Sequence, residues 1–399
     1  MTRHLLRLVW NRKRTNALLI VEIFFSFLVV FAVGTLGAFS WDSYRRPLGY
    51  DWRNLWVARI DMQQVSDDTF TQAQVEQSAR LLKEVQSLDA VESAAGTMAV
   101  PYDFGSYATV GDFDGKSLYI EFSEVTQDFD KVARLEVVRG RWFQPADAAR
   151  AWRPVVIDED LARDAFGDED PIGKKMDQSA PGSEAEESRV VGVVRDFRRS
   201  GELSGVEDFM FYLKRVGHPE DRPARTLLVR ARPGTPAPFE EQLSQRLQAV
   251  APDWSYQVKP LADLRTTALR LRIVPLLVGG LVAFFLLMMV GLGLLGVLWQ
   301  NLLQRTREIG LRRAAGASRA EVHRQIILEQ LLLTTLGVLL GTVLVIQIPI
   351  LDLIGIRPEI FVGGLLFAIA AIYSVVTLCV LYPSAMASRI QPAEALRYE

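Results

Sequence analysis

Four long apolar runs stand out from an otherwise mixed pattern of apolar and polar residues along the chain. They occupy residues 17–40, 273–298, 326–348 and 361–382. Glu22 and Glu329 are the only charged residues inside them. A helix of about 20 apolar residues crosses the hydrocarbon core of a bilayer, whereas a buried helix of a soluble domain is usually shorter and carries a polar stripe. The pattern therefore predicts four transmembrane helices, TM1 to TM4.

The first run could also be read as a signal peptide, because a basic segment precedes it. Its apolar part is 24 residues long, whereas the apolar part of a signal peptide has roughly 7–15 residues. No small-residue cleavage site follows it. We therefore interpret TM1 as an uncleaved membrane anchor.

Basic residues flank the runs unevenly, and this predicts the orientation. The amphipathic segment 1–16 contains five Lys and Arg and no acidic residue, and residues 299–325 contain six Arg against two Glu. Cytoplasmic flanks carry such an excess, so both segments and the tail 383–399 are expected in the cytoplasm. Residues 42–270, with 30 basic and 39 acidic residues, then lie outside. The expected location is the bacterial inner membrane, with both termini cytoplasmic.

Short strand-like and helix-like patterns alternate within residues 42–270. Strands are predicted at residues 55–60, 154–157, 189–194, 226–230 and 254–258, and helices at 71–88, 161–166 and 238–250. Such alternation indicates an α+β or α/β domain. The predicted fold is thus an α-helical membrane protein with four transmembrane helices and a large α+β extracytoplasmic domain of two subdomains between TM1 and TM2. Residues 176–188 are small and polar, which predicts a mobile loop. Helical spacing after Pro260 predicts that TM2 extends outward as a stalk.

Residues 42–270 show no recognisable catalytic pattern. Gly167 to Lys175 resembles a phosphate-binding loop, but five residues separate its glycines instead of four, and Lys175 stands where Ser or Thr is required. We interpret it as a turn. Three scattered histidines give no basis for a metal site, and a single cysteine excludes an intrachain disulfide. We therefore predict no catalytic residue, cofactor or metal on this chain. The net charge of −2 also argues against a nucleic-acid binder.

The cytoplasmic segment 299–325 reads as two helices joined by a glycine. Apolar spacing from Arg307 predicts a short helix that Gly316 ends as its C′ residue. Ser318 then caps the next helix, and Glu321 completes a capping box. A basic loop on anionic lipid is the simpler alternative. Because lipid contact does not require this construction, we favour a docking element for a cytoplasmic partner.

Several segments carry a family-specific pattern. They are REIGLRRAAGASRAEVHRQIILEQLLLTTLGVLLG at 307–341, the tail at 383–398 ending in PAEALRY, VRGRWF at 138–143, FGDEDPIGK at 166–174 and VVGVVRDF at 190–197. In these segments the chain resembles ABC transporter permeases of the MacB/FtsX/LolC-LolE class. The resemblance implies two permease subunits, as a homodimer or heterodimer, with two ATPase subunits. It further implies that the spans form no wide channel and instead pass motion to the outer domain, a mechanotransmission scheme.

The same resemblance assigns roles and partners. ATPase coupling is expected at seven residues: Arg307, Glu308, Gly310, Arg312, Arg313, Gly316 and Ser318. Many MacB proteins carry a fused ATPase before TM1, but only 16 residues precede it here, which implies a separate ABC ATPase holding ATP and Mg. The cargo would be a peptide, antibiotic, lipid or lipoprotein, handled with or without a periplasmic adaptor. One alternative is an FtsX-like regulator that recruits and activates a cell-wall hydrolase, although its outer domain is usually smaller. A membrane-anchored sensor or enzyme is a second alternative.

Polar and small residues inside the spans have two interpretations each. Glu22 and Glu329 could form a proton relay, but their shallow depth favours a structural role near the interface. Gly337 and Gly341 form a small-xxx-small motif that allows close helix packing, either within the chain or across a dimer. Cys379 is interpreted as a small packing residue.

Overall fold

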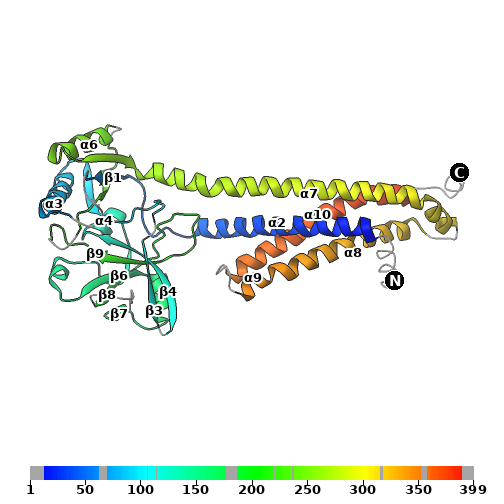
Figure 1. Ribbon diagram of the computed structural model, residues 1–399, viewed down its shortest axis with the longest axis horizontal. Coiled ribbons are helices and arrows are strands. Elements are labelled where there is room, and N and C mark those ends of the chain that lie inside the picture. Colours follow the sequence, from blue (N-terminus) through cyan, green and yellow to red (C-terminus); the bar gives the residue numbers. More distant parts are fainter. Residues whose placement is uncertain are drawn as a thin grey trace. The chain divides into compact units, whose positions relative to one another are not determined.

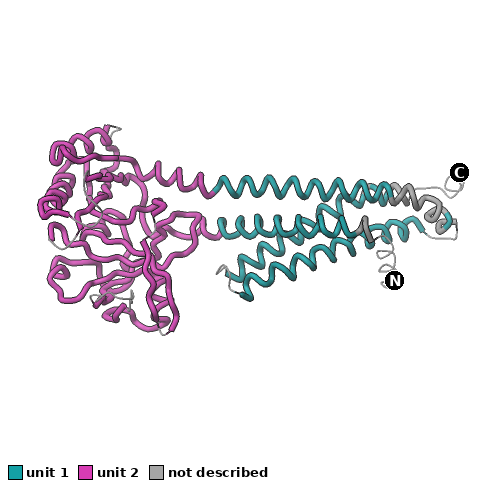
Figure 2. The backbone as a smooth tube through the Cα atoms, viewed as in Figure 1, with its two compact units in different colours: residues 1–41, 273–399 teal, residues 42–272 magenta. Residues whose placement is uncertain are grey.

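The computed structural model describes most of the chain. The described residues are 13–62, 70–105, 107–113, 115–176, 187–218, 222–235, 238–314, 318–351 and 357–388. The chain divides into two compact units (Figure 2). Unit 1 comprises residues 1–41 and 273–399, and unit 2 comprises residues 42–272. Most of the loop predicted at 176–188 lies outside the described residues.

Unit 1 is built from long apolar helices (Figure 1). They are α2 (Lys13–Arg45), α7 (Leu261–Ala314), α8 (Arg319–Val345) and α10 (Pro358–Ser388), with the one-turn α9 (Gln347–Ile350) between the last two. All four long helices have the length and hydropathy of membrane spans. The prediction of four transmembrane helices with an α+β domain between the first two is therefore confirmed.

Glycines allow each of the other three long helices to approach α2 closely. A Cβ atom added at Gly337 of α8 would lie 2.8 Å from Ile23, and one at Gly341 would clash with the Phe27 ring. Such an atom at Gly279 of α7 would lie 3.2 Å from Val33. Gly364 of α10 similarly lies against Thr35. The small-xxx-small motif of α8 thus packs within the chain, against α2.

One prediction about unit 1, a separate helix after TM2, is wrong. A separate short helix was expected from Arg307, but α7 continues from TM2 without a break to Ala314. The residues between Leu298 and Arg307 include good helix formers and no glycine or proline, so nothing ends the helix there. α10 includes the predicted TM4, residues 361–382, and extends beyond it at both ends, to Pro358 and Ser388.

Unit 2 contains two β-sheets. The smaller is antiparallel, with strand order β11-β1-β10-β2: Ser255–Pro260, Leu55–Asp61, Thr226–Ala231 and Val91–Gly96. Helices α3 (Gln72–Gln86) and α6 (Phe239–Val250) cover it, because their apolar faces, including Leu82 and Leu243, share a core with the sheet. Thr71 caps α3 through a capping box with Gln74. The prediction of these two helices is confirmed.

The larger sheet is mixed and has the order β3-β4-β9-β6-β8-β5. Its strands are Ala108–Phe113, Lys116–Val125, Asp208–Leu213, Arg153–Asp158, Ser188–Val194 and Val137–Gly140, and β7 (Lys175–Met176) pairs with β8. The short helix α5 (Glu159–Phe166) packs on this sheet, whereas α4 (Phe129–Ala133) contacts β2 and β10 of the smaller sheet. Its core includes an aromatic cluster in which the Phe197 ring lies 4.8 Å from that of Phe209 and 5.0 Å from that of Phe211.

Candidate functional site

Among the predicted coupling residues, the side chain of Ser318, at the start of α8, is described by the structure. The Ser318 hydroxyl accepts a hydrogen bond from the Glu321 backbone N–H at 3.2 Å, and the Glu321 carboxylate accepts one from the Ser318 N–H at 2.8 Å. This is the predicted capping box, and both residues are exposed. It fixes the direction in which the chain enters α8.

The other six coupling candidates are less fully described. Arg307, Glu308, Gly310, Arg312 and Arg313 lie on the last turns of α7, where only the backbone is described. Gly316 lies outside the described residues. The backbone therefore places five of these residues at the end of the TM2 helix and Ser318 at the beginning of the TM3 helix, and their role stays a prediction.

The two intramembrane carboxylates make local contacts. A Cβ atom added at Gly293 of α7 would lie 2.9 Å from a carboxylate oxygen of Glu22, so the glycine makes room for this side chain. The Glu329 carboxylate accepts a hydrogen bond from Gln325, one turn earlier on α8, at 3.0 Å. These contacts are of the kind expected for structural residues. Cys379 similarly lies against Gly291, as expected for a packing residue.

A buried arginine holds the end of α2 within unit 2. Arg198 follows β8 and is 1% exposed. Its Nη1 donates to the carbonyl oxygens of Ser43 at 2.7 Å and Arg46 at 3.3 Å, and its Nη2 donates to those of Glu202 at 3.0 Å and Ser204 at 2.5 Å. One guanidinium thus ties the last turn of α2 to residues 198–204, which we call the junction loop.

The junction loop also holds the first turns of α7. Arg265 Nε donates to the Glu202 carboxylate at 2.6 Å, and Arg272 Nη1 donates to the Leu203 carbonyl at 3.1 Å. The Tyr102 hydroxyl donates to the same Glu202 oxygen at 3.2 Å. The helix that enters unit 2 and the helix that leaves it are therefore bound to one short loop.

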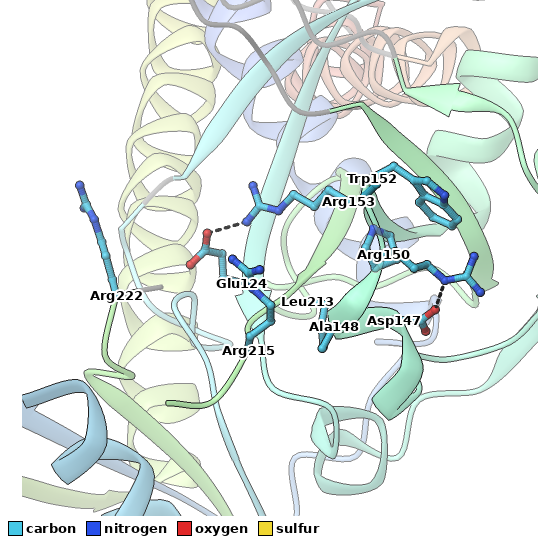
Figure 3. Close-up of a pocket in the computed structure, with 11 residues that line it drawn as sticks. Glu124, Asp147, Ala148, Arg150, Trp152, Arg153, Leu213, Arg215 and Arg222 are labelled. Atoms are coloured by element: carbon cyan, nitrogen blue, oxygen red, sulfur yellow. Dashed lines mark hydrogen bonds and ion pairs between the residues drawn. The ribbon is translucent and has the colours of Figure 1, made fainter. Parts of the chain in front are cut away.

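A pocket of about 340 Å³ opens on the larger sheet, and Figure 3 shows the side chains around it. Its charged lining residues are Glu124, Asp147, Arg150, Arg153, Arg215 and Arg222. Trp152, Leu213 and two alanines supply much of its apolar surface. Glu124 belongs to β4 and Arg153 to β6, and Asp147 lies in a 3-10 turn, so the sheet brings together residues distant in sequence.

Both carboxylates of this pocket are already bound to cations. Asp147 is fully buried and accepts two hydrogen bonds from Arg141, at 2.5 and 2.7 Å, and an ion pair from Arg150 at 2.8 Å. Glu124 pairs with Arg153 at 2.7 Å and with Lys214 at 2.9 Å. Burial alone would raise the pKa of each acid, but these cations outweigh burial and lower the pKa of both. The two carboxylates are therefore ionised and serve to position arginines.

Aromatic rings hold the same arginines. The Arg150 guanidinium lies 4.6 Å from the centre of the Trp152 ring, and that of Arg153 lies 3.9 Å from the centre of the Tyr212 ring. Such stacking restricts the guanidinium plane. Sequence reasoning missed both the pocket and the junction loop, because their arginines read as ordinary surface residues. The family-like pattern at 190–197 ends one residue before Arg198, but it does not show that Arg198 is buried.

Other sequence expectations in unit 2 concern nucleotides and metals. Gly167 lies at the C-terminal end of α5 with φ of +60°, and Lys174 pairs with Glu169 inside the turn that follows. The predicted turn is confirmed. Among the described residues, no group of three or more His, Cys, Asp or Glu is placed to hold a metal ion.

Comparison with known proteins matches most of the chain. A family model for the MacB-like periplasmic core domain matches residues 17–246, and one for the FtsX-like permease C-terminal region matches residues 280–392. The macrolide export ATP-binding/permease protein MacB of Bordetella avium is 26% identical over 285 residues, which are 69% of this chain and 42% of that protein. The chain thus spans less than half the length of this relative.

A permease and a solved structure illustrate the similarity further. The uncharacterized ABC transporter permease YknZ of Bacillus subtilis is 24% identical over 289 residues, 69% of each chain. The crystal structure of the periplasmic region of MacB from Actinobacillus actinomycetemcomitans aligns with 55% of this chain and 94% of its own, at 14% identity and a TM-score of 0.39.

Proposed function

The chain belongs to the family of ABC transporter permeases that join a MacB-like periplasmic core domain to an FtsX-like permease domain, and from that premise we propose its role. It is the transmembrane subunit that couples ATP hydrolysis by a separate ATPase subunit to movement of the domain inserted between TM1 and TM2. ATP and Mg bind to that partner. A second permease subunit, identical or paralogous, completes the transporter.

The continuity of α7 is the observation that carries this proposal. One helix includes the coupling candidates Arg307 to Arg313 at its end and Arg265 and Arg272, which bind the junction loop, near its start. A helix that continues without a break can transmit an axial displacement from one end to the other, since backbone hydrogen bonds brace its turns except at Pro275, which has no backbone N–H to donate. A docked ATPase that moves the end of α7 would therefore act on the junction loop.

The cap at Ser318 allows α8 to transmit a displacement as well. Because the capping box fixes the first turn of α8, force applied near residues 314–318 passes into TM3 instead of unwinding its end. We propose that the chain lies in a bacterial inner membrane. Its segment from Arg307 to Ser318 then lies in the cytoplasm and is the docking surface for the ATPase. The domain inserted after TM1 then lies outside and handles a peptide, antibiotic, lipid or lipoprotein.

The FtsX-like role, recruitment of a cell-wall hydrolase, is the second candidate. Both roles require the ATPase, so the outer partner discriminates between them. A tagged chain purified from native membranes should bring down the ATPase with a second permease or adaptor in the transporter role. Co-purification of a cell-wall hydrolase instead would support the alternative.

The capping box provides a direct test of coupling. Ser318→Ala removes a cap that contributes roughly 0.5–2 kcal/mol to helix stability. We expect the ATP turnover of the complex recovered with this variant to fall severalfold, whereas Ser318→Asp restores a side-chain acceptor and should retain most of the activity. Turnover is measured per mole of complex recovered.

Ser117→Ala is the matched control, because Ser117 is an exposed serine of β4, far in sequence from the cap. It should leave turnover unchanged. If Ser318→Ala also leaves both turnover and the amount of bound ATPase at the wild-type level, residues 307–318 are not the coupling site.

A further inference from the structure

The junction loop, residues 198–204, contains a residue that links the two helices it holds. The backbone carbonyl of Glu202 accepts a hydrogen bond from Arg198 Nη2 at 3.0 Å, and its carboxylate accepts one from Arg265 Nε at 2.6 Å. Nη1 of Arg198 donates to the carbonyl of Ser43 at 2.7 Å. A continuous chain of hydrogen bonds therefore leads from the last turn of α2, through Arg198 and Glu202, to the second turn of α7.

Most groups in this chain of hydrogen bonds are shielded from water. Ser43 is 3% exposed, Arg198 is 1% exposed and Glu202 is 7% exposed. A charge-assisted hydrogen bond is stronger where water does not compete for its donor and acceptor. Removing the ionic partner of a buried carboxylate is correspondingly costly. We therefore expect these contacts to form and to break together.

The two helices are attached to unit 2 by different kinds of contact. Leu261 and Ala268, on the first turns of α7, are buried in the same apolar core as Phe197, so α7 stays attached without any polar contact. Of residues 42–45 at the end of α2, all of which are described, only Ser43 is buried, and it is polar. Polar contacts rather than apolar burial therefore hold this turn of α2, and Arg198 supplies two of them.

Arg265 of α7 supports the hold on α2 through Glu202. Its guanidinium lies 4.4 Å from the centre of the Trp52 ring, and such stacking restricts the guanidinium plane. The Tyr102 hydroxyl donates to the same oxygen of Glu202 at 3.2 Å. Two donors thus fix the Glu202 side chain, which restricts the backbone carbonyl that Arg198 binds. The position of Arg198 therefore depends on a residue of α7.

We propose that Glu202 is a positioning residue that makes the end of α2 follow the first turns of α7. A displacement of α7 moves Arg265, Glu202 passes this movement to Arg198, and Arg198 passes it to the carbonyls of Ser43 and Arg46. The use of this link in transport rests on the proposed function, because that function supplies the displacement. The link itself lies within unit 2 and can be tested without an ATPase.

The test is hydrogen–deuterium exchange, read by mass spectrometry, on the purified full-length chain in detergent. Arg265→Met removes the guanidinium that binds Glu202 and keeps an unbranched side chain against Trp52. The variant should fold, since Leu261 and Ala268 still bury the start of α7. We expect amide exchange in residues 43–48 to become about threefold faster or more, because the hold on the end of α2 is weakened. Arg265→Lys restores a charged donor and should return most of the protection.

Glu202→Met removes the other partner of the same contact. It should accelerate exchange in residues 43–48 to a similar degree, and the double variant with Arg265→Met should accelerate it no further, because all these changes break one link. Wild-type exchange at 43–48 in either single variant would overturn the proposal. So would additive effects in the double variant, which would show that the two residues act independently.

Arg246→Met is the matched control, because Arg246 of α6 also pairs with a single carboxylate, that of Glu84 on α3, and neither residue belongs to the junction loop. It should leave exchange at 43–48 unchanged. Exchange in β10, an interior strand of the smaller sheet, should stay at the wild-type level in every variant. An equal acceleration in β10 and in residues 43–48 would indicate a general loss of stability and contradict a specific link.

Exchange in the complex with the separate ATPase distinguishes the link from the proposed function. ATP should change exchange at residues 43–48 in the wild-type complex, and much less in the Arg265→Met complex with the same amount of bound ATPase. If ATP changes nothing in the wild-type complex while the variants of the isolated chain behave as expected, the link holds and the proposed function fails. An equal ATP-dependent change in the wild-type and Arg265→Met complexes would overturn the link.

Discussion

Arg198 and Arg230 of unit 2 are each 1% exposed, and both bind the segment through which the chain enters this unit. Arg198 holds the carbonyls of Ser43 and Arg46. Arg230 is 1% exposed and donates to the carbonyls of Asp51 at 2.6 Å, Arg53 at 2.9 Å and Val132 at 2.7 Å. Main-chain carbonyls thus replace the water around each buried charge.

The sequence could not predict these two residues. Arginine is usually exposed and is rarely buried without a partner, and here most of the partners are backbone oxygens that any residue type provides. The same limit applies to the pocket, since Glu124, Arg150 and Arg222 become neighbours only through the order of strands in the larger sheet. The capping box of Ser318 and Glu321 was predictable because its two residues are only three positions apart in the sequence.

A pH-dependent contribution to stability is expected from Asp208, the first residue of β9. Burial, followed by the charges of Asp164 and Asp160, raises the pKa of Asp208 to about 6. The pKa in the unfolded chain is about 3.9. The folded chain therefore binds this proton more tightly, and the stability that protonation contributes is lost as the pH rises from about 4 to about 6.

Asp208→Asn removes the charge that is unfavourable in the folded state. We expect the variant to be more stable than the wild type at pH 7, by about 1–2 kcal/mol after allowance for solvent screening. Its unfolding midpoint should also vary less between pH 4 and 6. Thermal unfolding of the detergent-solubilised chain, followed by tryptophan fluorescence across this range, measures both. The exposed Asp253→Asn serves as control, and a variant that follows the wild-type pH curve would refute the assignment.

At the scale of elements, local pattern was informative where one face of an element is polar. Helices α3 and α6 were predicted for that reason, since apolar residues recur there at the spacing of one buried face. Strand β9, in which four successive residues from Phe209 to Tyr212 are buried, was not predicted; a short continuous apolar run by itself does not distinguish a strand from a buried helix. The break expected in α7 was wrong because the end of an apolar run does not by itself end a helix, and residues 299–306 contain no glycine or proline.

The contact of α8 with α2 predicts the effect of filling the space at Gly341. Gly341→Leu places a side chain where the Phe27 ring lies, so the helices must separate. Overpacking of this kind costs about 1–3 kcal/mol. The thermal unfolding midpoint of the detergent-solubilised chain should therefore fall by several degrees. Gly296→Leu in α7 is the control, because an added Cβ there meets no atom within 4 Å, and it should leave the midpoint unchanged. Equal midpoints for the two variants would show that the α2–α8 contact is dispensable.

At the scale of the whole molecule, hydropathy alone divides the chain correctly, because a span of about 20 apolar residues has few alternatives to a membrane helix. The arrangement of two sheets in unit 2 could not be predicted in the same way, since strand order depends on contacts between distant segments. The charge of the short flanks predicts which side of the membrane each segment occupies, and this orientation can be tested by labelling.

Single cysteines at Ser117 and Ser318, in a Cys379→Ser background, test sidedness. Both positions are exposed within their own units. An impermeant maleimide added to intact spheroplasts should label the cysteine at 117 and spare that at 318, and both should react after lysis. Labelling of position 318 in intact cells, or equal labelling of the two, would contradict the proposed orientation.

The close approach of three helices to α2 has a consequence for biosynthesis. Of the four long helices, α2 is synthesised first, yet its close partners on α7, α8 and α10 follow only after all of residues 42–260 have been translated. During that interval α2 is in the lipid without these partners. The inserted domain can meanwhile fold, because all its strands come from one continuous segment, residues 42–272. Packing of the four long helices against one another is therefore a late step in biosynthesis. A ribosome that stalls within the inserted domain leaves α2 in the membrane without α7, α8 and α10.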